Sequence, residues 1–479
     1  MVSNHSQNRL LLLMLPNLLS CLSSLLCKNH YANFCAIFTA IFSMTDKVSM
    51  CSISRISGIA YRNIQRFYSR HYDWNKLRFC LYDTFTTASS SCDNGGEILL
   101  TIDEVVEDKS GRSTFGLGRF YGGLYQKVVK GIAILQISAY HTDTKMSYPL
   151  VACQMHQNAA DRQRSKSRKA YLKELKARKA AAKLQGIPFE GKPKGRKKGN
   201  KNQQNTEKDD SMLLRYTKVL LQILIKLFDL FGRSCPKYLV GDGAFGNQHY
   251  IALALQYKLH LISKLKKNAK LRLPFNGTHP KGKRGPKTKF GQTIDYQNIP
   301  KQYLKEQKYN KFTKTFINTY QIKAYNDVSK ELINVVIIQE IDKNGQLKNN
   351  TVLFSTDTQL SYCQLTKYYR LRFPIEIDFR DAKQFFGLRH FKNVKENQVT
   401  NAINIAITAK LIAQIVIQHI AKEHGYENIS IIDLKTYFRN EYYAQKFINY
   451  EESDPNQLLI TANIMKIAQN EFINLKYAA

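Results

Sequence analysis

The stretch YYRLRFPIEIDFRDAKQFFGLRHF, at positions 368–391, determines more of the fold than any other part of the chain. With about 100° of rotation per residue, a helix over 364–386 would collect its large apolar side chains in one stripe. This stripe contains Leu371, Ile375, Phe379, Ala382 and Phe386. We therefore expect one face of the helix to pack on a hydrophobic core.

The edge beside the apolar stripe combines one carboxylate with cations and a phenol. Asp378 and Asp381 point away from Glu376, whereas four side chains lie within about 40° of it on the helical wheel: Tyr369, Arg372, Arg380 and Lys383. A carboxylate among cations suits a metal site where the cations also hold phosphates. Salt bridges on a surface helix would give the same pattern, so geometry alone leaves both interpretations open.

Pro374 complicates this helix, because a proline inside a helix removes one backbone hydrogen bond and clashes with the preceding turn. Either the helix kinks here, or a new helix begins with Pro374 in its first turn. The helical wheel therefore applies directly from Glu376 onward, whereas the position of Tyr369 relative to Glu376 depends on what happens at Pro374.

Two further acids follow apolar strands. Asp103 ends the run EILLTID at 97–103, and Asp242 ends KYLVGD at 237–242, where flanking glycines would let another backbone approach closely. Ligands of α/β sheets gather at strand ends. Together with Glu376, these acids provide oxygen ligands for a pair of Mg²⁺ ions, which at a separation of roughly 4 Å can activate an attacking oxygen and stabilise a leaving one. This is phosphodiester chemistry.

The remaining pattern alternates strands and helices, as in α/β proteins. The apolar runs at 131–138 and 148–155 are expected to form an antiparallel meander with the strand at 97–103. Helices at 212–231 and 246–255 and a strand at 259–265 complete this part of the pattern. Residues 266–350 are polar and rich in Lys and Tyr, with β-type runs at 312–325 and 332–341. We expect a β-rich insertion there, followed by a strand at 352–355 and a helix at 399–421.

The composition indicates a polyanionic partner. The 479 residues include 72 Lys+Arg against 37 Asp+Glu, a formal net charge of +35, and nucleic acid is the commonest partner of such a protein. Sixteen Lys/Arg and three acidic residues fall at 161–201, where we expect a helix to 184 and then a mobile loop, GKPKGRKKGNKNQQN. Such a tract binds phosphates without reading sequence, and we favour this over a merely solvated insertion.

The N-terminal region is expected to be helical. The apolar run at 10–27 is similar to a signal-peptide core or a weak membrane span, but Pro16 and several serines interrupt it. At 52–70, Gly58 separates two amphipathic stretches, and the second presents Arg62 and Arg66. This is typical of a helix-turn-helix and equally of a plain helical hairpin. Nine irregularly spaced cysteines without C-x-x-C favour a reducing cytosol over a disulfide framework or zinc ribbon.

The motif Y-x2-R-x3-E-x6-K occurs at Tyr369, Arg372, Glu376 and Lys383. With IDEVVEDKSG at 102–111, VGDGAFGN at 240–247 and FRDAKQFFGL at 379–388, it resembles the DDE transposases of bacterial insertion sequences, in the branch marked by that signature. The similarity spans about 97–388. It departs from the family at Glu104, the second residue of the first aspartate motif, and at Pro374, which interrupts the signature helix.

The resemblance implies an α/β ribonuclease-H-like mixed sheet flanked by helices, with a β-rich insertion and an N-terminal helical domain. We place a DNA-binding, helix-turn-helix-like region at 1–90 and the first part of the catalytic core at 91–265, with a basic insertion at 161–210. The β-rich insertion then occupies 266–350, the second part of the core 351–425, and a C-terminal helical region 426–479.

The resemblance also implies roles. Asp103, Asp242 and Glu376 would bind two Mg²⁺ ions, with Mn²⁺ as a substitute, and the expected DNA contacts are Tyr369, Arg372, Lys383, Arg380, Arg62 and Arg66. Water would cut the strand at a transposon end, and the freed 3′-hydroxyl would attack target DNA within a homodimer.

We expect a cytoplasmic, nucleoid-associated enzyme with no membrane and no obligatory protein partner. The alternatives are a hydrolytic nuclease on the same core, a non-catalytic DNA-binding relative, and a membrane role for the N-terminal run.

Overall fold

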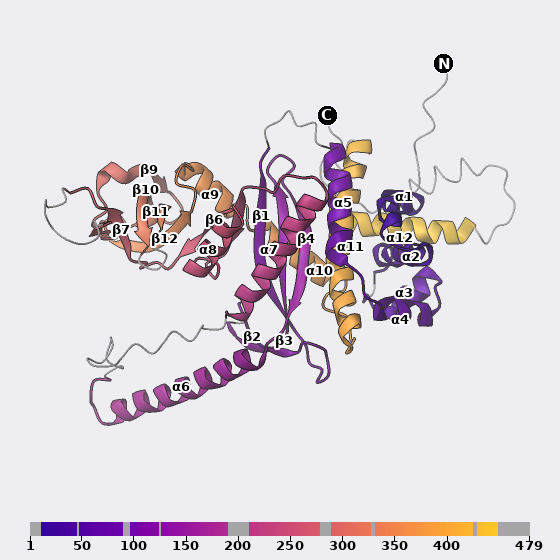
Figure 1. Cartoon of the computed structure of the whole chain (residues 1–479), viewed down its shortest axis with the longest axis horizontal. Coiled ribbons are helices and arrows are strands. Elements are labelled where there is room, and N and C mark those ends of the chain that lie inside the picture. Colours follow the sequence, from indigo (N-terminus) through magenta and orange to yellow (C-terminus); the bar gives the residue numbers. More distant parts are fainter. Residues whose placement is uncertain are drawn as a thin grey trace, which may run out of the picture.

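A large sheet runs through the molecule, and helices pack against it (Figure 1). The computed structural model describes residues 11–45, 47–89, 96–123, 126–189, 210–277, 289–326, 331–424 and 429–448. The sheet contains both parallel and antiparallel pairs. The predicted α/β class with a mixed sheet is therefore confirmed.

The central strands form an antiparallel half and a parallel half. β1 (Ile98–Asp108) pairs antiparallel with β3 (Lys127–His141), and β3 pairs antiparallel with β4 (Met146–Met155). β1 also pairs in parallel with β5 (Tyr238–Gly241), which pairs in parallel with β6 (His260–Leu265). The order β4-β3-β1-β5-β6 confirms the predicted meander. The short β2 (Gly118–Gly122), which pairs with the start of β3, was not foreseen.

The β-type runs of the predicted insertion are strands, and they extend the central sheet. β12 (Leu347–Ser355) pairs antiparallel with β6, and beyond it lie β11 (Leu332–Ile341) and β10 (Thr315–Asn326). Pairing with β12 covers the edge of β6, which would otherwise expose unpaired backbone groups. The smaller elements at the far end are β7 (Leu271–Pro274), β8 (Phe290–Thr293), η3 (Lys301–Tyr303) and β9 (Leu304–Asn310).

The prediction of one continuous helix over 364–386 is wrong. α9 (Tyr362–Arg370) ends before Pro374, and α10 (Pro374–Gln384) begins with that proline in its first turn. Proline is tolerated there because the missing N–H has no acceptor within the helix. The helix therefore restarts instead of kinking. The apolar stripe holds from Ile375 onward, since Ile375, Phe379, Ala382 and Phe386 are buried.

α11 (Glu396–His424) is a core helix that packs against β4, α10 and α5 (Trp74–Ser89). Among the residues that the structure describes, its stretch Glu396–Lys422 alone has the length and composition to cross a membrane, and 83% of the most apolar window is buried inside the protein. Packing against neighbouring elements therefore accounts for its apolar character.

The N-terminal part folds as helices, as predicted. The apolar run supplies Leu15, Leu19 and Leu22, which are buried in the core. Gly58, with a φ of 72°, ends α3 ahead of α4, as the predicted turn requires. These elements are α1 (Leu11–Leu18), η1 (Ser20–Ser24), α2 (Lys28–Ser43), α3 (Met50–Ser57) and α4 (Tyr61–Ser69), with α12 (Ile431–Ile448) packed on α2.

The basic tract begins with a helix, as predicted. α6 (Ala159–Leu184) has no buried residue and projects from the sheet (Figure 1). The predicted loop at 191–205 lies outside the described residues. Two further predicted helices are present: α7 (Met212–Leu230) packs on β3 and β4, and α8 (Gln248–Gln256) packs on β6.

Candidate active site

Asp103 and Asp242 lie beside each other on neighbouring parallel strands. Pairing between β1 and β5 ends at Ile102 and Gly241, so Asp103 is the next residue of β1, which continues to Asp108, and Asp242 is the first residue after β5. Adjacent strands are about 4.8 Å apart, which places both carboxylates at one edge of the parallel pair. The structure thus brings the two predicted aspartates together.

A tight turn holds Asp242 in place. The Ala244 N–H donates to Asp242 Oδ1 at 2.8 Å, and the Ser263 hydroxyl donates to the Asp242 carbonyl oxygen at 2.5 Å. Gly246 lets the turn lie against β6, because a Cβ there would come within 2.2 Å of the Lys264 carbonyl oxygen. At Gly243 the same carbonyl oxygen would be 3.6 Å away, which is an ordinary contact. Close backbone approach therefore requires a glycine at position 246 but not at position 243.

Glu376 comes from the first turn of α10, where the helix dipole favours a negative charge. Arg372 joins this carboxylate to Asp103: Nη2 donates to Glu376 Oε1 at 2.6 Å, and Nη1 donates to Asp103 Oδ2 at 2.8 Å. The side chains of Arg372 and Asp103 are 15% and 14% exposed, against 44% for Glu376. Water therefore screens the pair with Asp103 less than the pair with Glu376.

Negative charge is crowded at this edge of the sheet. Burial raises the pKa of Asp103 to about 6, the charges of Asp242 and Glu376 add to the shift, and Arg372 opposes it. Partial desolvation also raises the pKa of Glu104 to about 7, with contributions from Asp242 and Asp103. Asp103 therefore interacts with both other predicted acids, and a bound cation would relieve their repulsion.

The other side chains of α9 and α10 that we predicted to contact DNA have different partners in the structure. Burial raises the pKa of Tyr369, and the charges of Arg372, Asp242 and Asp103 also act on its hydroxyl, so this side chain lies near the acids. Lys383 Nζ lies 3.0 Å from Oε2 of the buried Glu107, which Arg389 also contacts at 3.1 Å. Arg380 is 63% exposed and pairs with its neighbour Asp381 at 3.1 Å. Tyr369 thus joins the acid cluster, whereas Lys383 is held by a carboxylate of β1 that the sequence did not indicate.

A cavity of about 720 Å³ opens beside these side chains. β1, α10 and the segment after α10 form its wall, which includes Asp103, Glu104, Glu376, Arg380, Lys383 and Arg389. Because the wall combines carboxylates with Lys and Arg side chains, the cavity suits an anionic ligand accompanied by cations.

A buried ion cluster anchors α10, and sequence reasoning missed it. Lys410 of α11 is only 6% exposed, and its Nζ lies 3.2 Å from Asp381 Oδ2 and 3.8 Å from Asp378 Oδ1. The hydroxyls of Ser147 and Ser138 donate to Asp378 Oδ2 at 2.6 Å and 3.2 Å. Burial raises the pKa of Asp378 to about 7, against the opposing charge of Lys410. A lysine in the middle of an apolar stretch of α11 was the available signal, because such a charge needs a buried partner.

The chemistry of the donor set fits a divalent metal ion. Asp103, Asp242 and Glu376 offer only carboxylate oxygens, which Mg²⁺ and Mn²⁺ prefer. Within the described part of the chain, no three His, Cys, Asp or Glu side chains lie close enough to hold an ion. Arg372 contacts two of the three acids in this arrangement. Metal binding at these residues therefore requires Arg372 to move away and the three carboxylates to come closer together.

The two predicted DNA contacts of the N-terminal region lie apart from this cavity. Arg62 and Arg66 are exposed on α4, whose opposite side buries Ile64 and Phe67. α4 packs against α11 and α3, so the basic face is held on the helical side of the molecule.

The chain belongs to a family of DDE superfamily endonucleases, whose family model matches residues 18–316. The matched stretch contains Asp103 and Asp242 and ends before Glu376. Members of this superfamily generally use divalent metal ions. No curated protein matched the chain. A cryo-EM structure titled piggyBac transposase synaptic complex with hairpin DNA is 13% identical, with a TM-score of 0.40, over 98% of this chain and 88% of that one.

The two glycines beside Asp242 provide a matched test of the turn. We expect Gly246→Ala to lower the free energy of unfolding by about 1–3 kcal/mol, because the new methyl group would overlap the backbone of β6. Gly243→Ala should change it by less than about 0.5 kcal/mol, since a methyl group there would make only ordinary van der Waals contact. Urea unfolding of both variants measures this. Equal values would contradict the close approach at Gly246.

The buried cluster under α10 can be tested through its lysine. We expect Lys410→Met to lower the free energy of unfolding by about 3 kcal/mol, because it leaves the buried Asp378 without its cation and Asp381 with the exposed Arg380 alone. The control is Lys422→Met, which alters an exposed lysine of the same helix. Urea unfolding should separate the two variants clearly, and a loss below about 1 kcal/mol for Lys410→Met would argue against the anchor.

Proposed function

We propose that this endonuclease is a DNA transposase that cuts transposon ends and transfers them into target DNA. Asp103, Asp242 and Glu376 would be its catalytic carboxylates. The observation that carries the proposal is the double contact of Arg372, which ties Glu376 to an aspartate whose neighbour on the adjacent parallel strand is also an aspartate. Two of these acids, Asp103 of β1 and Glu376 of α10, lie in the wall of a cavity that also carries cations.

We further propose a ribonuclease-H-like core. The strand order β4-β3-β1-β5-β6, antiparallel in the first half and parallel in the second, supports it. The domain boundaries at 90, 265, 350 and 425 belong to the same proposal, with the basic insertion at 161–210. The Y-R-E-K signature supports assignment to the insertion-sequence branch.

In the proposed mechanism, Asp103, Asp242 and Glu376 would hold two Mg²⁺ or Mn²⁺ ions. Metal ions of this kind activate an attacking oxygen and neutralise the leaving one. Arg372 would exchange its two carboxylate partners for phosphate oxygens, which the planar guanidinium can bind in the same bidentate way. Tyr369 would contact the phosphates together with Arg372. Lys383 and Arg380 would reach the phosphates from the α10 side of the cavity.

DNA recognition would involve the exposed face of α4 with Arg62 and Arg66, following a helix-turn-helix arrangement of α3 and α4. Transposon ends and target DNA would be the partners, within a homodimer that needs no other protein and no membrane. We place the enzyme in the cytoplasm, at the nucleoid.

Substitution of the acids tests the site. We expect Asp103→Asn, Asp242→Asn and Glu376→Gln each to lower metal-dependent cleavage by about 1000-fold or more, because each removes a proposed metal ligand. Glu104→Gln is the matched control beside Asp103 and should stay within about tenfold of the parent protein. Plasmid nicking measures cleavage, and DNA binding without metal checks that each variant is folded. Retained cleavage in Glu376→Gln would overturn the assignment.

The products of the reaction separate transposition from hydrolysis. With oligonucleotides carrying transposon ends and a supercoiled plasmid, strand transfer should give covalently joined products. Nicks alone would support the alternative of a hydrolytic nuclease, and binding without either product would support a non-catalytic relative. A pre-cleaved end with a free 3′-hydroxyl should still be joined, whereas an end with a 3′-deoxy terminus should not, because the attacking oxygen is missing.

A further inference from the structure

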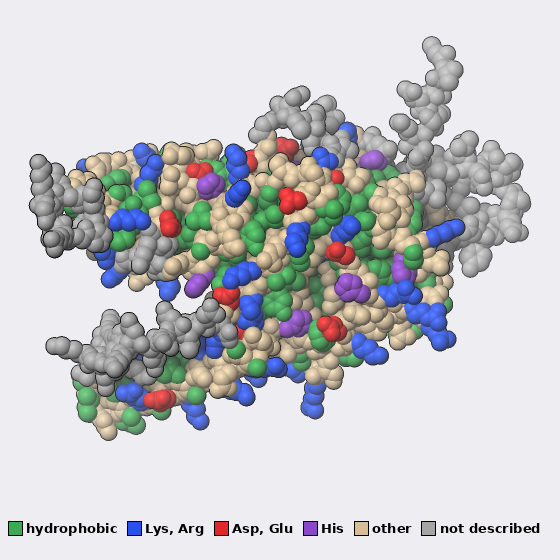
Figure 2. All heavy atoms as spheres, in the orientation of Figure 1, with side chains coloured by type: hydrophobic (Ala, Val, Ile, Leu, Met, Phe, Trp, Pro, Cys, Tyr) green, Lys and Arg blue, Asp and Glu red, His purple; other side chains and the backbone are tan. Residues whose placement is uncertain are grey.

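α6 stands away from the rest of the protein and is strongly basic. Its 26 residues include ten Lys/Arg and two acidic residues, and none of them is buried. Figure 1 shows the helix leaving the sheet and pointing outward, and Figure 2 shows Lys and Arg side chains along it. Hydrophobic packing therefore does not account for its position or its composition.

The cations of α6 are not spread evenly around the helix. At about 100° per residue, six of them fall within an arc of about 100°, at spacings of three and four residues. Alanine occupies the one remaining position of this series, Ala180. The basic stripe consists of Arg162, Lys166, Lys169, Lys173, Lys176 and Lys183. With a rise of about 1.5 Å per residue, it runs straight for roughly 32 Å.

The charge of this basic stripe is not neutralised within the described part of the chain. Both acids of α6 lie outside the arc and bind other cations: Asp161 contacts Arg164 and Arg215, and Glu174 contacts Arg178. None of the six stripe residues forms an ion pair with a described residue. Like charges three and four residues apart destabilise a helix, so an anion beside the stripe would stabilise α6.

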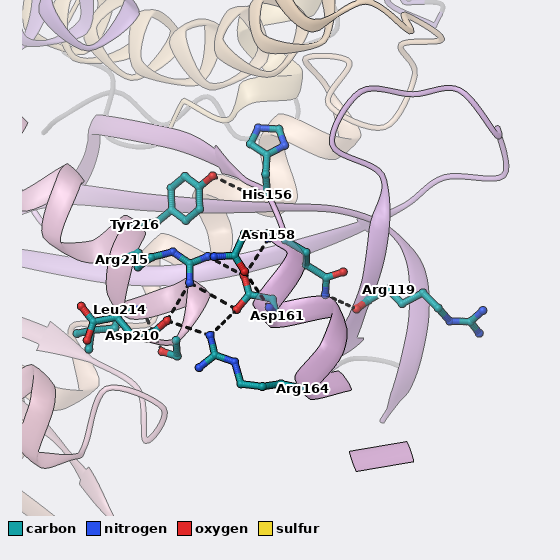
Figure 3. A network of polar contacts seen from close by, with 11 residues as sticks. Arg119, His156, Asn158, Asp161, Arg164, Asp210, Leu214, Arg215 and Tyr216 are labelled. Atoms are coloured by element: carbon teal, nitrogen blue, oxygen red, sulfur yellow. Dashed lines mark hydrogen bonds and ion pairs between the residues drawn. The ribbon is translucent and has the colours of Figure 1, made fainter. Parts of the chain in front are cut away.

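A network of polar contacts holds the base of α6 against the start of α7 (Figure 3). Asn158 and Asp161 form a capping box, and Arg215 of α7 donates to Asp161 Oδ2 at 2.6 Å and to the Asp210 carbonyl oxygen at 2.8 Å. The helix begins just after β4, which runs in the same direction as β1 because both are antiparallel to β3. α6 therefore leaves the sheet at the end where β1 also has its carboxyl end, since Met155 of β4 and Val106 of β1 both lie opposite Ala133.

We propose that the basic stripe of α6 is a binding surface for the phosphate backbone of duplex DNA. This inference rests on the proposed function for DNA as the substrate. A straight stripe of about 32 Å matches about nine base pairs at 3.4 Å each, and duplex DNA is straight over this length. The contact involves charge alone, so it does not depend on base sequence. A second copy of the helix is not the occupant, because two such stripes repel each other.

Two triple variants of the full chain test the proposal. The stripe variant is Lys169→Ala, Lys173→Ala, Lys176→Ala, and the control is Arg168→Ala, Arg178→Ala, Lys179→Ala, which removes three charges from the rest of the same helix. Alanine preserves helix propensity in both. Fluorescence anisotropy with a 30-base-pair duplex of arbitrary sequence, in metal-free buffer at several salt concentrations, gives the binding constant and its salt dependence.

We expect the stripe variant to lower the slope of log K against log salt by about 2.7 and to weaken binding roughly tenfold or more near 0.1 M salt. The control variant should change the slope by less than about one. Equal changes in both variants would overturn the proposal, because net charge would then account for the binding. Absence of duplex binding in the parent protein would also overturn it, as would a larger stripe-dependent slope with duplex RNA of the same length.

The metal-free readout keeps this test separate from the proposed cleavage. If the stripe variant lowers the slope but the parent protein cuts no DNA, the result would support DNA binding by the basic stripe of α6 and count against the proposed transposase activity. If the parent protein cuts DNA but the stripe variant leaves the slope unchanged, the result would support the endonuclease activity and count against DNA binding by the basic stripe.

Discussion

The position of Glu376 depends on the buried ion pairs of Lys410. Asp378 and Asp381 face the interior, where Lys410, Ser138 and Ser147 satisfy them. Residues two positions apart on a helix point about 200° away from each other, so an inward Asp378 turns Glu376 outward to the cavity. Rotation of α10 by a single residue would leave buried charges without partners, which is a large cost. The core thereby fixes which acid of α10 is available for chemistry.

Arg372 then balances a cluster of acids that the fold has forced together. Parallel pairing of β1 with β5 brings Asp103 beside Asp242, and α10 adds Glu376. Repulsion and burial raise the pKa of Asp103 to about 6, although the guanidinium opposes the shift. A positive charge at this edge offsets the repulsion between the acids. Arg372 supplies it here, and a metal ion has the charge and the oxygen preference to take its place.

Sequence patterns predicted the parts of the site that depend on local chemistry. Apolar runs that end in an acid predicted Asp103 and Asp242, which the structure places side by side, although β1 continues past Asp103 to Asp108. The apolar stripe predicted the buried face of α10. The choice of Glu376 over Asp378 needed the family signature, because the helical wheel left it open. The partners of Lys383 and Lys410 could not be predicted, since Glu107 and Asp378 meet them through strand pairing and helix packing between distant segments. The joining of β6 to β12 was missed for the same reason.

The positive charge of the chain falls into two kinds that the structure separates. Around the cavity, cations face carboxylates: Arg372 contacts Asp103 and Glu376, and Lys383 contacts Glu107. Their energies depend on burial and geometry, and salt screens them weakly. The basic stripe of α6 is exposed and forms no ion pair with a described residue, so its attraction to an anion is long-ranged and sensitive to salt. The first kind suits selective contacts at a reacting phosphate, and the second suits capture of a polyanion before it reaches the cavity. The net charge of +35 therefore combines cations that face carboxylates with cations that do not, and only the three-dimensional arrangement distinguishes them.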